Sequence, residues 1–75
     1  MELETLRKVI ATVLGVDPYE IEMDTTFLGD LGADSLDIYQ IAMGVEKELN
    51  ITISWDKVEK VTTVREAIAL IKASE

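Results

Sequence analysis

The stretch of sequence that decides the fold is Asp30-Leu31-Gly32-Ala33-Asp34-Ser35-Leu36-Asp37. A glycine-containing turn leads into a serine that stands between two carboxylates, and an apolar pattern with helical spacing starts at this point. Either Asp34 or Ser35 can act as the N-cap of that helix. No base stands near Ser35 in the sequence, so the serine is not typical of a catalytic nucleophile. We interpret it as a serine that another enzyme modifies.

Apolar residues recur at helical spacing in three segments, which predicts three longer helices. The first segment ends at Gly15, in the usual stop position. The third opens at residues 63–66, where Thr-Val-Arg-Glu has the pattern of a capping box. The second segment follows Ser35, and its apolar stripe consists of Ile38, Ile41, Ala42, Val45 and Leu49.

The segments between these helices predict one short helix and two loops. Ser54 can cap a short turn that contains Trp55 and Val58. Residues 51–53 alternate like a strand, but no second strand is there to pair with them, so they predict an extended loop. The whole pattern predicts an all-α fold, a four-helix bundle with three longer helices, one short third helix and a long first loop, in a single domain over residues 1–75.

The long first loop, from Gly15 to Ala33, is unusual for a chain of this size. It starts with Asp17-Pro18-Tyr19-Glu20, the pattern of a capped turn with proline at the first helical position. Loops this long are uncommon in compact domains. Because its large apolar residues argue against disorder, we expect them to be buried across the bundle: Ile21, Met23, Phe27, Leu28 and Leu31.

Composition excludes several classes of function. The 75 residues include no cysteine and no histidine, which removes disulfides, thiolate nucleophiles, the commonest general base and the commonest metal ligand. The net charge is -8, and residues 17–37 hold seven acids and no base. Such a chain would be repelled by nucleic acid and anionic membranes and attracted to basic protein surfaces. Glu2 and Glu4 argue against a signal peptide, and no apolar run could span a bilayer, so we expect a cytoplasmic protein.

The chain resembles an acyl carrier protein of the fatty-acid-synthesis type. The resemblance rests first on the eight-residue run around Ser35, which is a specific motif at the start of the second helix. It extends over nearly the whole chain, through segments that match the family: Phe27-Leu28, Gly15-Val16-Asp17-Pro18, Met43, Glu46, Ile51-Thr52-Ile53 and Val61-Thr62-Thr63-Val64.

This resemblance implies that Ser35 carries 4′-phosphopantetheine, transferred from coenzyme A by a separate phosphopantetheinyl transferase that uses magnesium. Asp34, Leu36 and Asp37 complete the attachment site, and no resident metal and no catalytic residue is expected. The arm brings its own thiol, which fits a chain without cysteine. A helix N-terminus also favours a phosphodiester. The simpler interpretation is that Ser35 is only an N-cap, which is worth roughly 1 kcal/mol.

Two faces of the second helix are expected to have different roles. The apolar stripe from Ile38 to Leu49 faces the other helices and could part around an acyl chain, although it also serves as ordinary core. The opposite face carries more apolar area than a solvated face normally does. We therefore predict that it binds partner enzymes with basic surfaces, through Leu36, Tyr39, Gln40, Met43, Glu46 and Lys47. The carrier itself is expected to be a monomer.

Other interpretations stay open or fail on particular residues. A calcium loop that starts at Asp24 fails, because its twelfth position is Ser35 rather than glutamate. A hydrolase fails because there is no histidine. An unmodified acidic interaction domain remains an alternative, and so does a carrier for a specialised polyketide or aminoacyl pathway. The specialised carrier gains support from residues that depart from the pattern of fatty-acid carriers: Gln40, Gly44, Lys47 and Ser54-Trp55.

Overall fold

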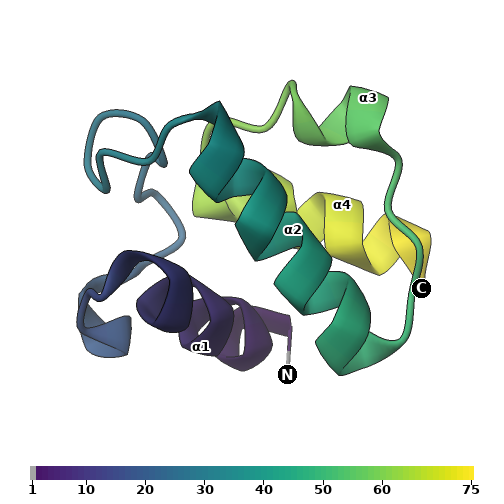
Figure 1. Cartoon of the computed structure of the whole chain (residues 1–75), viewed down its shortest axis with the longest axis horizontal. Coiled ribbons are helices and arrows are strands. Elements are labelled where there is room, and N and C mark those ends of the chain that lie inside the picture. The colour runs from purple at the N-terminus through teal and green to yellow at the C-terminus, as the bar shows by residue number, and fades with distance from the viewer. Residues whose placement is uncertain (1) are drawn as a thin grey trace.

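The computed structural model describes residues 2–75, which form four α-helices and one short 3-10 helix (Figure 1). Their bounds are α1 Glu2–Leu14, η1 Pro18–Glu20, α2 Ser35–Leu49, α3 Trp55–Val58 and α4 Val64–Ser74. Within the described residues there is no strand, and one isolated bridge pairs Thr26 with Thr63. The predicted all-α bundle, with three longer helices and one short third helix, is confirmed.

The three longer helices enclose the core, and α3 lies along one edge of the bundle. Figure 1 shows α2 crossing in front of α4, with α1 on one side of α2 and α3 on the other. The largest of the fully buried side chains come from α1, α2, α4 and the long loop: Leu6, Ile10, Ile21, Val45 and Val64. None of the helices within residues 2–75 has the length and apolar character needed to cross a membrane.

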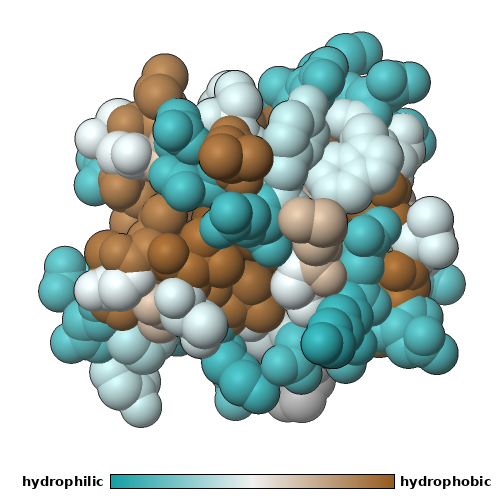
Figure 2. All heavy atoms as spheres, in the orientation of Figure 1, coloured by the Kyte–Doolittle hydropathy of each residue, from teal (hydrophilic) through white to brown (hydrophobic). Residues whose placement is uncertain are grey.

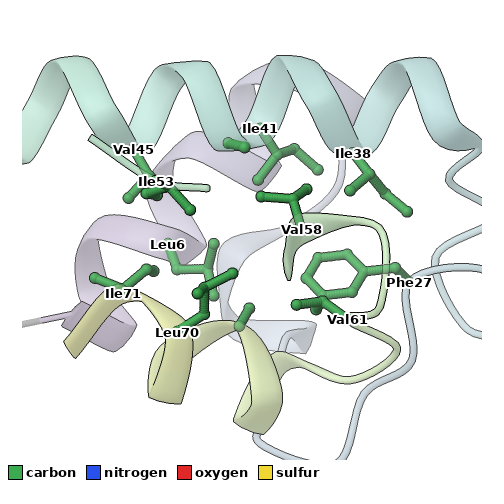
Figure 3. Close-up of a pocket in the computed structure, with 12 residues that line it drawn as sticks. Leu6, Phe27, Ile38, Ile41, Val45, Ile53, Val58, Val61, Leu70 and Ile71 are labelled. Atoms are coloured by element: carbon green, nitrogen blue, oxygen red, sulfur yellow. The ribbon is translucent and has the colours of Figure 1, made fainter. Parts of the chain in front are cut away.

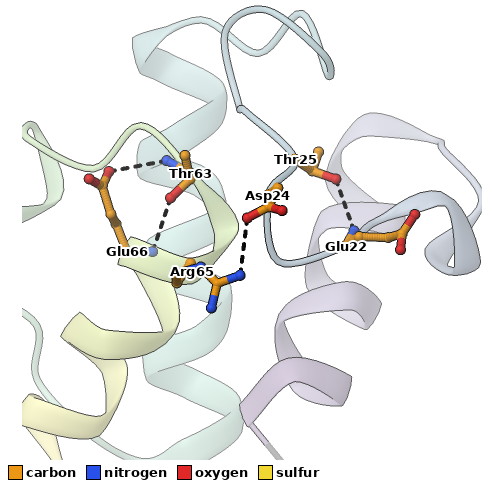
Figure 4. Close-up of polar contacts among 6 residues, drawn as sticks. All are labelled: Glu22, Asp24, Thr25, Thr63, Arg65 and Glu66. Carbon is orange, nitrogen blue, oxygen red and sulfur yellow. Dashed lines mark hydrogen bonds and ion pairs between the residues drawn. The ribbon is translucent and has the colours of Figure 1, made fainter.

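Two arginine side chains contact the middle of the long loop, one from α1 and one from α4. The Arg7 side chain donates from Nε to the Ile21 carbonyl oxygen at 2.8 Å. Further along, Arg65 at the start of α4 pairs with Asp24 at 3.0 Å (Figure 4). Ile21 and Phe27 are buried as expected, but the expectation for Leu28 was wrong, because 75% of its surface is exposed.

Capping residues fix where α2 and α4 begin. The Thr63 hydroxyl accepts from the Glu66 N–H, and Glu66 in turn accepts from the Thr63 N–H (Figure 4), so the predicted capping box is confirmed. Glu66 also accepts from both the hydroxyl and the N–H of Thr62. Hydrogen bonds from Thr62, and then the Thr63 N–H, lower the pKa of the Glu66 carboxyl below its ordinary value.

Gly44 of α2 lies against Val9 of α1. A Cβ atom at this position would lie 2.7 Å from Cγ1 of Val9, a buried β-branched side chain that has little freedom to move. Glycine in a helix interior costs up to about 1 kcal/mol relative to alanine. The close packing of the two helices accounts for a residue that helix propensity alone would disfavour.

We predict that Gly44→Ala lowers the stability of the wild-type chain but raises that of a Val9→Ala variant. In the wild type, overpacking costs about 1–3 kcal/mol, which outweighs the gain of up to about 1 kcal/mol in helix propensity. Without the Val9 branches, only that gain remains. Urea unfolding of the wild type, the two single variants and the double variant measures the effect of Gly44→Ala with and without the Val9 branches. If Gly44→Ala stabilised the wild-type chain, the close packing of Gly44 against Val9 would be contradicted.

Candidate functional site

Ser35 is the first residue of α2, and its hydroxyl is free. The N-cap is Asp34, whose Oδ1 accepts from the Asp37 N–H at 2.9 Å, while Asp37 Oδ2 accepts from the Asp34 N–H at 3.3 Å. Ser35 is exposed and makes no side-chain hydrogen bond with residues 2–75. The simpler interpretation of Ser35 as the N-cap is therefore wrong. The N–H groups of the first turn that the box leaves unpaired favour an anion at this end of the helix.

The preceding loop holds Ser35 in this position. Thr26 and Asp30 bond reciprocally, each side-chain oxygen accepting the other residue's N–H at 2.9 Å. Gly32 then adopts a φ of 63°, a left-handed conformation that favours glycine. Ala33 is fully buried, and its N–H donates to the Phe27 carbonyl oxygen at 2.8 Å. The turn, the buried alanine and the capping box together present the hydroxyl outward.

Two surface hollows meet at Ser35, and they share Ile38 and Glu59. The first lies between α2 and α3, where Tyr39 and Val58 complete its wall. The second lies against the long loop and the segment before α4, and its other lining residues are Thr26, Phe27, Leu28, Ala33, Val61 and Thr62. Ser35 thus stands at the junction of three elements rather than on an isolated helix end.

Behind these hollows lies an apolar cavity of about 40 Å³ between α2 and α4. Figure 3 shows Ile38 and Phe27 at the end near the start of α2, with Val45, Leu6 and Ile71 at the opposite end. Four of the five stripe residues of α2 line the cavity, whereas Leu49 packs on the core without lining it. The lining residues from outside α2 had no signal in the sequence beyond being apolar: Leu6, Phe27, Ile53, Val58, Val61, Ala67, Leu70 and Ile71.

The outer face of α2 has two kinds of residue. Leu36 and Met43 are exposed by 65% and 50%, and Gln40 and Lys47 are also exposed. The Glu46 carboxylate is instead partly buried and accepts from the Ile53 N–H at 2.7 Å. In Figure 2 the apolar surface gathers between α1 and the long loop, and smaller apolar areas lie along α2 among hydrophilic residues. The role of this face in binding partners remains a prediction.

Tyr39 is half-buried against α3 rather than free on the outer face. Its ring meets that of Trp55 edge-on, with ring centroids 5.1 Å apart and an interplanar angle of 76°. Its hydroxyl donates to Glu59 Oε1 at 2.7 Å. Glu59 could not be predicted as a partner of Tyr39, because nothing in the spacing of residues 39 and 59 shows that α3 folds over α2.

Most acids of residues 17–37 have local structural roles. Asp17 accepts from the Tyr19 N–H, Asp30 from the Thr26 N–H, and Asp34 and Asp37 form the capping box. Asp24 pairs with Arg65. Within residues 2–75, no three acidic side chains come together in a group that could hold a metal ion. Caps and turns therefore explain much of the acidity that the sequence suggested for partner binding.

We predict that Tyr39 loses its proton at a higher pH than an ordinary tyrosine, whose pKa is about 10. The hydrogen bond to Glu59 raises the pKa of Tyr39, and burial and the nearby charges of Glu59 and Asp56 raise it further. Because the folded-state pKa exceeds the unfolded one, the stability from this bond is full below about pH 10 and is lost as the pH rises through the folded value.

Tyrosinate absorbance in a Tyr19→Phe background follows Tyr39 alone, because the chain has two tyrosines. Adding Glu59→Gln should lower the pH midpoint of the Tyr39 titration toward the pKa of an ordinary tyrosine. Unfolding the chain in denaturant should lower that midpoint in the same way. An unchanged midpoint in the Glu59→Gln chain would contradict the assigned cause.

Comparisons with known proteins agree on one family. The sequence model of the phosphopantetheine attachment site matches residues 4–71. An acyl carrier protein of Clostridium acetobutylicum is 42% identical over 73 residues, covering 97% of this chain and 95% of its own. One from Zymomonas mobilis is 43% identical over 68 residues, covering 91% and 87%. A solved structure of a Mycobacterium tuberculosis protein, assigned as an acyl carrier protein, superposes with a TM-score of 0.89 at 26% identity over 97% of both chains.

Proposed function

Because this chain belongs to the acyl carrier proteins, we propose that Ser35 is the residue to which its 4′-phosphopantetheine is attached. Proteins of this family are carriers rather than enzymes, and they bear that group covalently. The arm supplies the thiol on which acyl groups travel as thioesters. We further propose that residues 1–75 form one carrier domain, a cytoplasmic monomer, and that its acyl groups are intermediates of fatty acid synthesis.

The observation that carries this proposal is the state of the Ser35 hydroxyl. It is exposed at the first position of α2, and the cap that helix initiation needs is supplied by Asp34 instead. Esterification of Ser35 therefore breaks no hydrogen bond of the fold. The unpaired N–H groups of the first turn favour the phosphodiester, and the two hollows beside Ser35 give the arm apolar surface to lie against.

The cavity behind Ser35 supports a role in shielding the acyl chain. Its volume of about 40 Å³ is small compared with about 150 Å³ for a cavity that admits benzene. An acyl chain would therefore enter only as α2 and α4 move apart, which suits a lining made of aliphatic side chains and one phenylalanine. The proposed lining from α2 is Ile38, Ile41, Ala42 and Val45, with Leu49 behind it.

The outer face of α2 is the proposed docking surface for the transferase and the acyl-processing enzymes with which this family interacts. Leu36 and Met43 give it an apolar centre close to Ser35. Asp34 and Asp37 beside them favour partner surfaces that are basic around an apolar patch. Gln40 and Lys47 lie on the same exposed face, so these two departures from the fatty-acid pattern fall where partners would be distinguished.

We predict that Leu36→Ala reduces transferase kcat/KM by tenfold or more, the usual range for an exposed apolar anchor at an interface. Its melting temperature should stay within a few degrees, because 65% of the Leu36 surface is already exposed. Tyr19→Ala is the matched control, since Tyr19 is 85% exposed but lies on η1. Equal losses in both variants would remove the argument for the α2 face.

The fatty acid assignment is tested by loading and elongation. The chain that carries the arm is incubated with malonyl-coenzyme A, an acyl-primed donor, a malonyl transferase and a fatty acid condensing enzyme. We expect transfer of malonate to the thiol, followed by an elongated acyl thioester, both seen as intact mass. A chain that accepts the arm but neither malonate nor an elongated chain would instead belong to a specialised pathway.

A further inference from the structure

Two consecutive residues of α2 face two consecutive residues at the end of α3. The inner pair, Ile38 and Val58, lines both the hollow beside Ser35 and the apolar cavity between α2 and α4. The outer pair, Tyr39 and Glu59, is joined by the 2.7 Å hydrogen bond. The two apolar side chains therefore form the wall between Ser35 and the cavity, and the polar pair bridges the surface directly outside that wall.

The α3 segment is held weakly by its own structure. α3 has four residues, and its N-cap Ser54 makes no side-chain capping bond. Extended residues precede it and a turn follows it, while Val58 alone within α3 is buried. A short element with few internal bonds and little buried surface is the kind that opens locally before the rest of a fold.

Tyr39 supplies stabilising contacts that α3 lacks within its own residues. Within residues 2–75, its bond to Glu59 is the one side-chain hydrogen bond that joins α2 to residues 54–61. The same side chain also packs edge-on against Trp55 at the start of α3. Tyr39 therefore touches both ends of the short helix, on the surface that covers the Ile38–Val58 wall.

We propose that Tyr39, Glu59 and Trp55 form a latch that controls passage of an acyl chain between Ser35 and the cavity. Glu59, which directly follows α3, borders both hollows at Ser35. Displacing α3 and Glu59 would therefore open the Ile38–Val58 wall, whichever hollow the arm occupies. The inference rests on the proposed role of Ser35 as the attachment residue and adds Tyr39 and Glu59 as positioning residues that set how readily the wall opens.

The first test is amide hydrogen exchange of the chain without the arm. The N–H groups of Val58 and Glu59 bond to the Ser54 and Trp55 carbonyl oxygens, so they exchange when α3 opens. Tyr39→Phe removes the hydroxyl and keeps the ring. We expect it to speed exchange at these two amides by about fivefold, the effect of losing one hydrogen bond, with no comparable change inside α1 and α4.

Two variants serve as controls for this test. Glu59→Gln keeps an acceptor oxygen at the same position and should preserve most of the protection. Tyr19→Phe removes the hydroxyl of an exposed tyrosine far from α3 and should change nothing. Unchanged exchange at Val58 and Glu59 in Tyr39→Phe would overturn the latch. An equal increase in all four helices would also overturn it, since the bond would then stabilise only the fold as a whole.

The second test follows passage itself. On the chain loaded with an octanoyl thioester, the latch predicts that an acyl group held in the cavity leaves through this wall before hydroxylamine cleaves the thioester in bulk solvent. Tyr39→Phe should raise the cleavage rate by a similar factor, and Glu59→Gln should not. If the wild type cannot be loaded, the proposed function fails. If both forms load and are cleaved at equal rates, the latch alone is wrong.

Discussion

We expect the Ser35→Ala chain to fold normally and to gain no phosphopantetheine mass when it is incubated with coenzyme A, magnesium and a promiscuous transferase. We expect a complete loss because, within residues 2–75, Ser35 is the one hydroxyl-bearing residue at the first position of a helix. The fold survives because Asp34 and Asp37, rather than Ser35, cap the helix. The melting temperature should stay within a few degrees, as for most substitutions on an exposed surface.

The two remaining serines provide the controls. Ser54 is exposed at the N-cap of α3, where it makes no side-chain capping bond. The Ser74 hydroxyl donates to the Leu70 carbonyl oxygen at 2.8 Å near the end of α4. Ser54→Ala and Ser74→Ala should both be modified as fully as the wild type. Modification of the Ser35→Ala chain would move the attachment site elsewhere.

Phe27→Ala should cause the largest loss of stability of any single change in the long loop. Phe27 is 97% buried, since only 3% of its surface is exposed, and truncation of a buried phenylalanine costs about 3–5 kcal/mol. Its backbone also joins the loop to two other segments, donating to the Thr62 carbonyl oxygen and accepting from the Ala33 N–H. Since small domains have about 5–15 kcal/mol in total, much of the stability would be lost.

Urea unfolding measures this loss, and a pair of variants keeps it interpretable. Phe27→Leu should retain the fold with a smaller loss, even if Phe27→Ala does not fold. Leu28→Ala removes a neighbouring side chain that is 75% exposed and should change the stability by no more than about 0.5 kcal/mol. Similar losses for Phe27→Leu and Leu28→Ala would mean that Phe27 does not anchor the loop.

The helices could be predicted because their signals are local. The Thr63 capping box and the stripe of α2 depend only on residues a few positions apart, and both are found as expected. Residue type alone does not choose between Asp34 and Ser35 as the N-cap, since aspartate and serine both cap helices well. The reciprocal bond between Asp34 and Asp37 settles it, and a capping box with aspartate at its third position is less familiar than one with glutamate.

The parts that could not be predicted depend on contacts between distant segments. A helical wheel places Tyr39 on the outer face of α2, but it cannot show that Trp55 and Glu59 fold over it. In the same way, helix propensity alone disfavours Gly44 inside α2, and only its contact with Val9 explains why a glycine stands there. Leu28 was expected in the core because an irregular loop has no period from which to tell inward from outward residues.

The central claim is that Ser35 carries the arm, and fragmentation of the intact modified protein tests it most directly. The wild-type chain is incubated with coenzyme A, magnesium and a phosphopantetheinyl transferase, and its mass is measured before fragmentation. We predict the gain of a single phosphopantetheine, present on every fragment that contains Ser35 and on none that lacks it. No gain in mass, or a gain located on fragments without Ser35, would contradict the account.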